Sequence, residues 1–531
     1  MVIQTRFRAS IFLYLFFSLL NSCSDADVSE EENVKDTMDT ADTADTADTA
    51  DTADTADTAD TADTADTADT ADTADTADTA DTADTADTFV SVDDTESGGG
   101  NPDTDEVGTE NDTSIDSEAD SESTVVPGDR QIIGYFAQWG IYARNYLVKN
   151  IHTSGSAEKL TVINYAFGNV VDNRCSVGVS QAGVGDAWAD YQKSFSDAES
   201  VDGVGDVWGD PLRGNWNQLK KLKAMYPRLK VLISLGGWSW SQNFSDAALP
   251  ENRAAFVESC IDLYIRGNLP FDSASEVGGD GVLTGVFDGI DIDWEYPGTE
   301  GLAGNVVRAE DPQNFTALLS EFRLRLDEIN RDLMLTAALP SGKSHYEVLE
   351  LDKIHQSLDS LNLMNYDYHG AWNAAGPTNF QANLYPAEGD PSAATDSFSS
   401  HATIVDYLAA GVPESKLVMG IPFYGRGWSG VTDAANGLFQ PATGAATGSF
   451  EAGVEDYKVI QSFGYPVFTD DVAVASWAFN GSTFWTFDTP EVITAKMTYI
   501  KSNNLGGAMA WELDGDTQDG QLLSAIFNGL K

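Results

Sequence analysis

The sequence predicts an α/β fold for residues 130–531: one (β/α)8 TIM barrel with a small α+β insertion between its seventh and eighth strands. Two observations predict this fold. From Arg130 onward, short apolar runs alternate with helical patterns, which is typical of a parallel sheet built from βα units. Eight such runs within about 400 residues suit a single elaborated barrel, whose active site lies at the carboxyl ends of its strands.

The eight runs are the predicted strands: Ile132–Trp139, Leu160–Phe167, Val231–Gly237, the acidic run Phe287–Gly298, Leu333–Ala338, Ser360–Tyr366, Leu417–Tyr424 and Gly506–Leu513. Between the fourth and fifth runs, Asp311-Pro312 supplies a cap and a first helical turn. Apolar residues follow it at helical spacing, and they predict a helix that packs on the sheet: Phe315, Leu318, Leu319, Phe322 and Leu326.

Two stretches are longer than a minimal barrel needs. Val170–Asn217 is rich in glycine and aspartate and carries three tryptophans, and we expect it to form one wall of the site. Residues 429–483 lie between the last two strands and are long enough for an inserted subdomain. We assign Trp477 and Trp485 to core packing rather than to ligand binding.

The acidic run reads Phe287-Asp288-Gly289-Ile290-Asp291-Ile292-Asp293-Trp294-Glu295-Tyr296-Pro297-Gly298. In a β-strand, Asp291, Asp293 and Glu295 share one face and the large apolar residues share the other. Three neighbouring carboxylates raise one another's pKa, so one of them is expected to hold a proton near neutral pH and to serve as a general acid. Asp288 falls on the opposite face and is predicted to give structural support.

Two ordinary explanations of this run fit poorly. A solvated edge strand would not alternate its acids with isoleucine and tryptophan. A calcium loop of the EF-hand type needs a glycine after its third acid, where this chain has Trp294.

Residues 1–23 predict an export signal. Arg6 and Arg8 precede an apolar run, Ile11–Leu20, that is about half the length needed to cross a bilayer. The following Leu20-Asn21-Ser22-Cys23 is similar to a bacterial lipoprotein processing box, although Asn21 replaces the usual small residue. We expect lipidation at Cys23 and a place on the cell surface; ordinary cleavage and secretion remain open.

Residues 24–129 form a predicted disordered, acidic linker with 36 acids and one base. From Asp39 to Thr88 it repeats Asp-Thr-Ala, which cannot bury a core and repels itself, so we expect an extended tether. Its threonines could carry sugars or stay unmodified. Residues 130–531 are also acidic, which disfavours nucleic acid and anionic lipid as partners. We therefore expect membrane contact only through a lipid anchor at Cys23.

Cys175 and Cys260 are the other cysteines, too few for a disulfide scaffold. Cys260 lies among apolar residues of a predicted helix. We therefore expect a buried, inert thiol there.

Residues 130–531 resemble the chitinases of glycoside hydrolase family 18, specifically bacterial members with an insertion subdomain. Phe287–Glu295 fits the signature D-x-x-D-x-D-x-E, Leu232–Trp238 fits S-x-G-G, and Met364–Asp367 fits M-x-Y-D. Trp511 stands where the family places the tryptophan on the floor of the site. Phe423–Trp428, followed by a long insertion, resembles the subgroup in which an α+β module deepens the cleft.

The resemblance implies a retaining hydrolysis of β-1,4 linkages between N-acetylglucosamine units, assisted by the substrate through an oxazolinium ion. Glu295 would be the acid and then the base, Asp293 would orient the acetamido group, Asp291 would share a proton with Asp293, and Tyr366 would bind the acetamido oxygen. Tyr135 and Ser234 would bind Asp291, and Asp367 would grip the sugar. The remaining predicted substrate-binding residues are Trp238, Met364, Trp372, Tyr424, Arg426 and Trp511.

We therefore expect a monomeric chitinase that acts on chitin or chito-oligosaccharides without a metal or a cofactor. Three alternatives remain at this point. An endo-β-N-acetylglucosaminidase acting on glycoproteins would share the acidic run, but Trp511 and the insertion argue against it. A carbohydrate-binding barrel without catalysis would typically lack the terminal acid, whereas Glu295 is present. Nothing in the sequence favours a peptidoglycan hydrolase.

Overall fold

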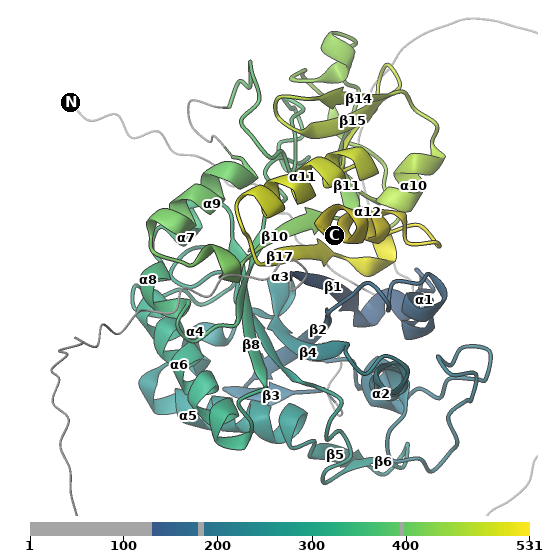
Figure 1. The fold of residues 1–531 in the computed structure, drawn as a ribbon, viewed down its shortest axis with the longest axis vertical. Coiled ribbons are helices and arrows are strands. Elements are labelled where there is room, and N and C mark those ends of the chain that lie inside the picture. The colour runs from purple at the N-terminus through teal and green to yellow at the C-terminus, as the bar shows by residue number, and fades with distance from the viewer. Residues whose placement is uncertain (1–129, 179–184, 393–397) are drawn as a thin grey trace, which may run out of the picture. The chain divides into compact units, whose positions relative to one another are not determined.

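The computed structural model describes residues 130–178, 185–392 and 398–531 (Figure 1). The predicted signal peptide with Cys23 (1–23) and the predicted linker (24–129) lie outside the described residues. Within the described ranges, no helix is both long enough and apolar enough to cross a membrane.

Eight parallel strands of the described chain close into a barrel, as predicted. They are β1 (Gln131–Ala137), β2 (Val162–Val171), β4 (Lys230–Gly236), β7 (Gly289–Asp293), β8 (Met334–Pro340), β9 (Ser360–Met364), β10 (Leu417–Pro422) and β17 (Gly507–Trp511). Each strand pairs with the next in this order, and β1 also pairs with β17, which closes the sheet. Each of the eight predicted runs therefore overlaps a barrel strand, with ends shifted by a few residues.

Helices lie outside the strands (Figure 1). The longer ones are α1 (Val148–Thr153), α2 (Gly214–Met225), α5 (Pro250–Cys260), α6 (Asp311–Ile329), α9 (Ser400–Ala409), α11 (Pro490–Ser502) and α12 (Gln521–Leu530). Short helices α3 (Gly237–Trp240), α4 (Phe244–Ala247), α7 (Lys343–Tyr346) and α8 (Leu351–Ile354) occupy other connections. The predicted helix is α6, which begins at Asp311 and buries all five of the apolar residues that predicted it. The main core lies between these helices and the outer face of the barrel.

The insertion is an antiparallel sheet with one short helix, α10 (Tyr457–Ser462). Its strands are β11 (Tyr424–Ser429), β12 (Gly444–Ala445), β13 (Val454–Asp456), β14 (Val467–Asp470), β15 (Ala475–Phe479) and β16 (Phe484–Thr486). The subdomain is wider than the predicted 429–483, because the chain bends at Phe423 and enters the new sheet at Tyr424. Trp477 belongs to the small core of the insertion and Trp485 to the main core, as expected.

The long segment after β2 begins with the short strand β3 (Arg174–Ser176), which turns back antiparallel along the end of β2. A single turn of π-helix at Trp188–Gln192 follows. Trp216 at the start of α2 is buried, whereas Trp188 and Trp208 are more than half exposed. A two-stranded hairpin, β5 (Leu269–Asp272) and β6 (Val277–Gly279), precedes the acidic strand.

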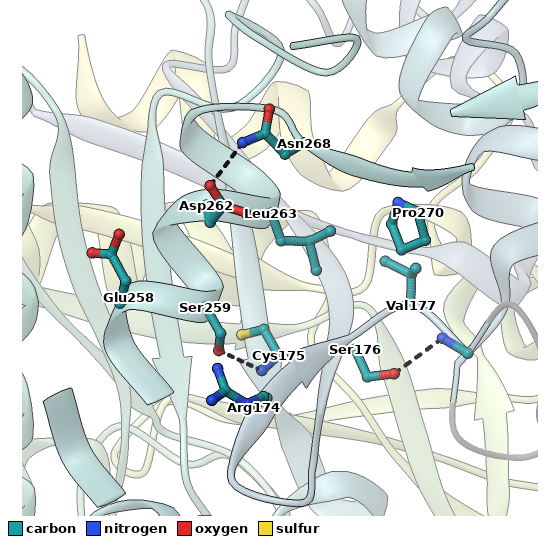
Figure 2. A pocket seen from close by; sticks show the side chains of 11 residues that line it. Arg174, Cys175, Ser176, Val177, Glu258, Ser259, Asp262, Leu263, Asn268 and Pro270 are labelled. Atoms are coloured by element: carbon teal, nitrogen blue, oxygen red, sulfur yellow. Dashed lines mark hydrogen bonds between the residues drawn. The ribbon is translucent and has the colours of Figure 1, made fainter. Parts of the chain in front are cut away.

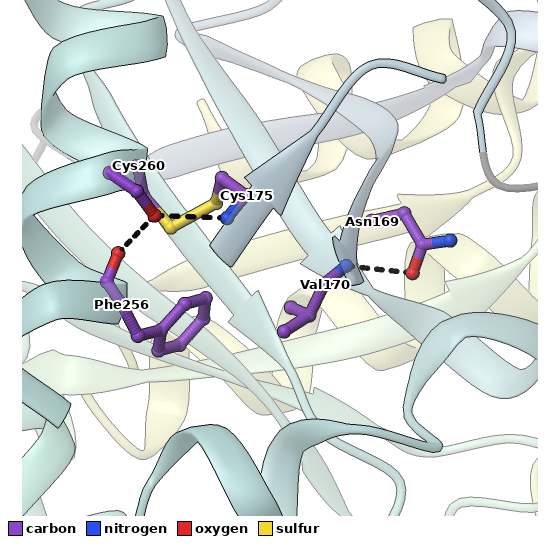
Figure 3. Close-up of a disulfide and its surroundings, with 6 residues drawn as sticks. Asn169, Val170, Cys175, Phe256 and Cys260 are labelled. Atoms are coloured by element: carbon purple, nitrogen blue, oxygen red, sulfur yellow. Dashed lines mark hydrogen bonds between the residues drawn. A yellow bond between two sulfur atoms is a disulfide. The ribbon is translucent and has the colours of Figure 1, made fainter. Parts of the chain in front are cut away.

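The prediction of a free thiol at Cys260 is wrong, because Cys260 forms a disulfide with Cys175 (Figure 3). The β2–β3 hairpin carries Cys175 over the end of α5, and the two Cα atoms lie 4.9 Å apart. Ser259 Oγ also accepts a hydrogen bond from the backbone N–H of Cys175 at 3.0 Å. The two cysteines are 85 residues apart, so their meeting depends on a hairpin that the strand prediction did not include.

Candidate active site

Strand β7 presents its acids to the interior of the barrel. Ile290 and Ile292 pack in the main core on the outer side, which leaves Asp291 and Asp293 on the inner side. Trp294 follows the strand and packs between Phe244 and Phe315. The alternation of acids and apolar residues therefore has the predicted orientation, and Glu295 stands just beyond the carboxyl end of β7.

Asp291, the most deeply buried of these three acids, is surrounded by hydrogen-bond donors from four other strands. Its Oδ2 accepts from Tyr135 Oη at 2.7 Å and from Ser234 Oγ at 2.8 Å. Its Oδ1 accepts from Thr336 Oγ1 at 2.5 Å and from Asn362 Nδ2 at 3.2 Å. Burial raises the pKa of Asp291, and these hydrogen bonds oppose that rise because they stabilise the carboxylate.

Asp293 lacks the hydrogen-bond donors that surround Asp291. It is buried, and its Oδ1 has no hydrogen-bond partner among the described residues. Burial, Glu295 and Asp291 all raise the pKa of Asp293 well above its ordinary value. When Asp291 and Asp293 hold one proton between them, the donors around Asp291 favour the proton on Asp293.

Glu295 is fixed through its backbone. Its N–H donates to Ser241 Oγ at 2.8 Å, and its carbonyl accepts from Asn305 Nδ2 at 2.9 Å. Burial raises the pKa of the Glu295 side chain to about 7, a hydrogen bond from Tyr296 lowers it, and the charge of Asp367 raises it. A carboxyl group with a pKa near neutral can give and take back a proton at physiological pH.

Gly236 lets β4 approach the acidic strand closely. It has φ +109°, and a Cβ atom there would lie 2.2 Å from the carbonyl oxygen of Asp293. Gly237 follows with φ +73°. The S-x-G-G motif therefore has a physical reason: the chain must turn next to β7 without a side chain in the way.

Asp367, which follows β9, contacts two residues of β11. Asp367, with φ +58°, accepts hydrogen bonds at its Oδ1 from Tyr424 Oη and from Arg426 Nε, each at 2.7 Å. Tyr366 is half-buried, and its ring lies 6.2 Å from that of Tyr424. Burial and then Asp293 raise the pKa of Tyr366 well above its ordinary value, so its hydroxyl stays a donor. Met364 is half-buried at the end of β9.

Three of the predicted substrate-binding residues are tryptophans: Trp511, Trp238 and Trp372. Trp511, at the end of β17, contacts Tyr135 at 5.3 Å and stacks on Phe167 at 5.7 Å between ring centroids. Trp238 in α3 is 50% exposed, and Trp372 is 56% exposed with the Arg426 guanidinium 5.2 Å from its ring centroid. Exposed indole faces of this kind suit the C–H faces of sugar rings.

Asp288 lies at the opposite end of β7 from Glu295. Its Oδ2 accepts the N–H of Val231 at 2.9 Å, and Lys223 of α2 forms an ion pair with the same oxygen at 2.7 Å. These contacts join the amino ends of β4 and β7 to the last turn of α2. They fit the structural support that the sequence predicted.

Sequence reasoning missed several neighbours of the acids. Thr336 and Asn362 are the two donors to Asp291 that no motif marked. Thr336 lies in a strand that is otherwise apolar, and Asn362 lies between two leucines of β9, so the polarity of these two residues was a usable signal. Trp139 and Phe167, which contact Trp511, were also missed as site residues.

A cavity of about 470 Å³ lies away from these residues, beside the disulfide (Figure 2). Its lining comes from β3, the end of α5 and the start of β5, and includes Arg174, Cys175, Glu258 and Asp262. None of the predicted site residues lines it. Within the described ranges, no group of three or more histidine, cysteine, aspartate or glutamate side chains has the arrangement of a metal site.

The family model for the glycosyl hydrolases family 18 matches residues 131–516. The chain belongs to this family. Members of family 18 are glycosidases in which the substrate, and not a protein carboxylate, supplies the nucleophile. Membership therefore agrees with a site in which Asp293 ends β7 and Glu295 follows two residues later.

Two curated relatives of this family-18 chain are similar over most of its length. It is 42% identical over 408 residues to Chitinase 63 of Streptomyces plicatus, covering 76% of this chain and 61% of that protein. It is 42% identical over 391 residues to Chitinase C of Streptomyces lividans, covering 73% and 58%. The chain thus spans about three fifths of the length of these relatives.

Among solved structures, the catalytic domain of psychrophilic chitinase B from Arthrobacter TAD20 is similar to this family-18 chain. It superposes with a TM-score of 0.72 at 42% identity. The match covers 76% of this chain and 96% of that domain.

Proposed function

We propose that this protein is a chitinase: it hydrolyses β-1,4 linkages between N-acetylglucosamine units in chitin and chito-oligosaccharides, with retention of configuration. The observation that carries the proposal is the buried Oδ1 of Asp293, which has no partner among the described residues and lies on the strand that leads to Glu295. A buried acceptor without a protein partner, close to a general acid, can accept a hydrogen bond from a substrate group that must be held next to the scissile bond.

In the first step Glu295 donates its proton to the glycosidic oxygen, and the leaving sugar departs as an alcohol. The carbonyl oxygen of the neighbouring acetamido group attacks C1 of the sugar, and an oxazolinium ion forms. Asp293 accepts the acetamido N–H and stabilises the positive charge that develops on the ring. Asp291 shares a proton with Asp293: the four donors around Asp291 favour that proton on Asp293 in the free enzyme, and Asp291 takes it up when Asp293 accepts the acetamido N–H.

In the second step Glu295, now a carboxylate, takes a proton from a water molecule that attacks C1. The oxazolinium ring opens, and the sugar is released with its original anomeric configuration. Tyr366 donates to the acetamido oxygen. Asp367, positioned by Tyr424 and Arg426, binds the hydroxyl groups of the reacting sugar.

The substrate chain lies along the aromatic residues. Trp511 forms the floor beneath the reacting sugar, and Trp238 and Trp372 bind neighbouring units by stacking. The enzyme acts as a monomer, and it needs no metal or cofactor because the substrate supplies the nucleophile and Glu295 supplies the proton.

The test compares the wild type with Glu295→Gln on chitin hexasaccharide. Products are followed by mass spectrometry, and their anomeric form by NMR within the first minutes. We expect the wild type to release mainly the β-anomer and the variant to lose at least about 100-fold in kcat, as is typical when a general acid is removed. Binding of the hexamer without cleavage by the wild type would refute the proposal, and would favour a carbohydrate-binding barrel or a glycoprotein substrate.

We also propose that the protein is exported and anchored by a lipid at Cys23, with residues 24–129 as a tether. The disulfide between Cys175 and Cys260 supports export, because such bonds persist in oxidising compartments outside the cytosol. Fractionation of producing cells tests the anchor. The wild type is expected with the membranes and Cys23→Ser in the soluble fraction; a wild type found only in the medium would overturn the anchor.

A further inference from the structure

One of the four donors to Asp291 differs in kind from the other three. Three of them are hydroxyl groups, those of Tyr135, Ser234 and Thr336. The fourth is the side-chain amide of Asn362 in β9, whose Nδ2 donates to Asp291 Oδ1 at 3.2 Å. A hydroxyl group donates to an ionised carboxylate and, after rotation of its hydrogen, accepts from a protonated one, whereas an amide NH2 group only donates. Among these four partners, Asn362 alone therefore favours the ionised state of Asp291.

A second hydrogen bond sets the orientation of the Asn362 amide. Ser360, two residues earlier in β9, donates its hydroxyl to Asn362 Oδ1 at 3.2 Å, so the amide oxygen faces Ser360 and the nitrogen faces Asp291. All three residues are fully buried. A flip of the amide would break both hydrogen bonds and turn the whole group inside a packed interior, whereas a hydroxyl reverses by moving one hydrogen. The group that faces Asp291 thus stays a donor through the reaction.

The direction of this hydrogen bond bears on the proton that Asp291 and Asp293 share. The two acids stand two residues apart on the inner face of β7. A donor fixed on Asp291 stabilises the state in which Asp291 is ionised and Asp293 holds the proton, and it opposes the reverse state. The reverse state is the one that the reaction needs once Asp293 accepts the acetamido N–H of the substrate.

We propose that Asn362 is a positioning residue for this shared proton: through Asp291 it holds the proton on Asp293 until a substrate binds, and Ser360 orients its amide for that role. The inference rests on the proposed function, in which the two acids share one proton. The bond from Asn362 is the longest of the four to Asp291 in which both distances and partners are known, at 3.2 Å beside 2.5–2.8 Å for the hydroxyl groups. Its effect therefore comes from its fixed direction and not from its strength.

The expected change in pH dependence follows from the loss of one donor. The titratable groups that face Asp291 stay in place when Asn362 is replaced: Tyr135 of β1, Asp293 of β7, Glu295 just beyond β7, and Tyr366 just beyond β9. Removal of the amide makes the ionised form of Asp291 less stable, so the pair of acids takes up its second proton at a higher pH. With two protons on the pair, Asp291 has no room for the proton of Asp293, and the reaction stops.

The first test is the pH dependence of kcat/KM for chitin hexasaccharide with full-length Asn362→Leu. This ratio reports the groups of the free enzyme, and kcat reports those of the substrate complex. We expect the acidic limb of kcat/KM to move to higher pH by about half a unit to one unit, and the basic limb of Glu295 to stay. We expect kcat at the optimum to change by less than about threefold, because the substrate complex has the proton on Asp291. An acidic limb at the wild-type position would overturn the proposal.

Asn164 of β2 provides a matched control. It is a fully buried asparagine of a barrel strand, and its amide has no hydrogen-bond partner among the described residues. Asn164→Leu makes the same substitution without removing a bond to Asp291, so its pH profile should stay that of the wild type. An equal shift in both variants would reflect a general effect on the barrel interior and would overturn the proposal. Ser360→Ala leaves Asn362 in place and should move the limb in the same direction by less; an unmoved limb would contradict the orienting role of Ser360.

Thermal unfolding gives a second readout that needs no activity. The bond from Asn362 stabilises an ionised carboxylate, so the thermal midpoint of Asn362→Leu should lie below that of the wild type at neutral pH. This gap should shrink as the pH is lowered and Asp291 takes up a proton, whereas the gap for Asn164→Leu should not depend on pH. A wild type that leaves the hexamer uncut would refute the proposed function, and the two gaps would still decide the bias at Asp291. A gap for Asn362→Leu that does not depend on pH would overturn the inference.

Discussion

The disulfide between Cys175 and Cys260 allows a quantitative prediction for the variant Cys175→Ala/Cys260→Ala. The bond closes a loop of 85 residues, which restricts the unfolded chain. The chain-entropy relation gives about 4.5 kcal/mol of stabilisation for a loop of this length. Alanine is preferred to serine, because Cys260 is fully buried and a hydroxyl there would add the cost of an unpaired polar group.

This free energy converts into a temperature. A folded region of roughly 400 residues has an unfolding entropy of about 0.8 kcal/mol/K, at about 2.1 cal/mol/K for each residue. The loss of about 4.5 kcal/mol therefore lowers the thermal midpoint by about 5 °C. Differential scanning calorimetry at a fixed scan rate measures it.

The control is the wild type with and without reductant. The reduced wild type should have the same thermal midpoint as the alanine variant, and reductant should not change the thermal midpoint of the variant. A variant that melts within 1 °C of the oxidised wild type would refute the entropic argument. Peptide mapping that recovers both cysteines as free thiols in the unreduced wild type would refute the bond itself.

Two further substitutions test buried polar groups. Thr336→Val removes the shortest hydrogen bond to Asp291, which should lower the unfolding free energy by about 1.5–3 kcal/mol and reduce kcat. Thr336→Ser keeps the hydroxyl and should keep the wild-type stability and kcat. Chemical unfolding measures the stability, and initial rates measure kcat. Lys496→Met leaves the buried carboxylate of Asp488 unpaired and should lower the unfolding free energy by about 3–5 kcal/mol. The double variant Lys496→Met/Asp488→Leu should recover most of this loss. A single variant with the stability of the wild type would contradict the prediction.

The barrel could be predicted from the sequence because its strands, apart from the acidic β7, are mostly apolar runs that are buried on both faces. The carboxyl end of β10 could not be predicted, because the run Leu417–Tyr424 continues without interruption past the bend at Phe423. The carboxylates, the glycine turn and the aromatic residues were predictable because local motifs mark them.

The partners of those motifs were harder to predict. Which polar side chain reaches Asp291 depends on the register of four strands, and a single-strand pattern does not contain that register. Thr336 lies directly opposite Asp291 in the β7–β8 pair, but Asn362 belongs to a strand that does not pair with β7. Cys175 was missed for a similar reason, because its position depends on the hairpin that follows β2.

The acidic strand shows how one β-strand gives different protonation states to similar groups. Asp291 lies deepest, where other strands surround it and can supply four donors, so it carries the charge. Asp293 is one pleat nearer the end, where burial persists but donors do not, so it favours the proton. Glu295 lies beyond the carboxyl end of β7, where burial raises its pKa to about 7 and lets it give and take back a proton. The depth of each acid in the barrel therefore determines its chemical role.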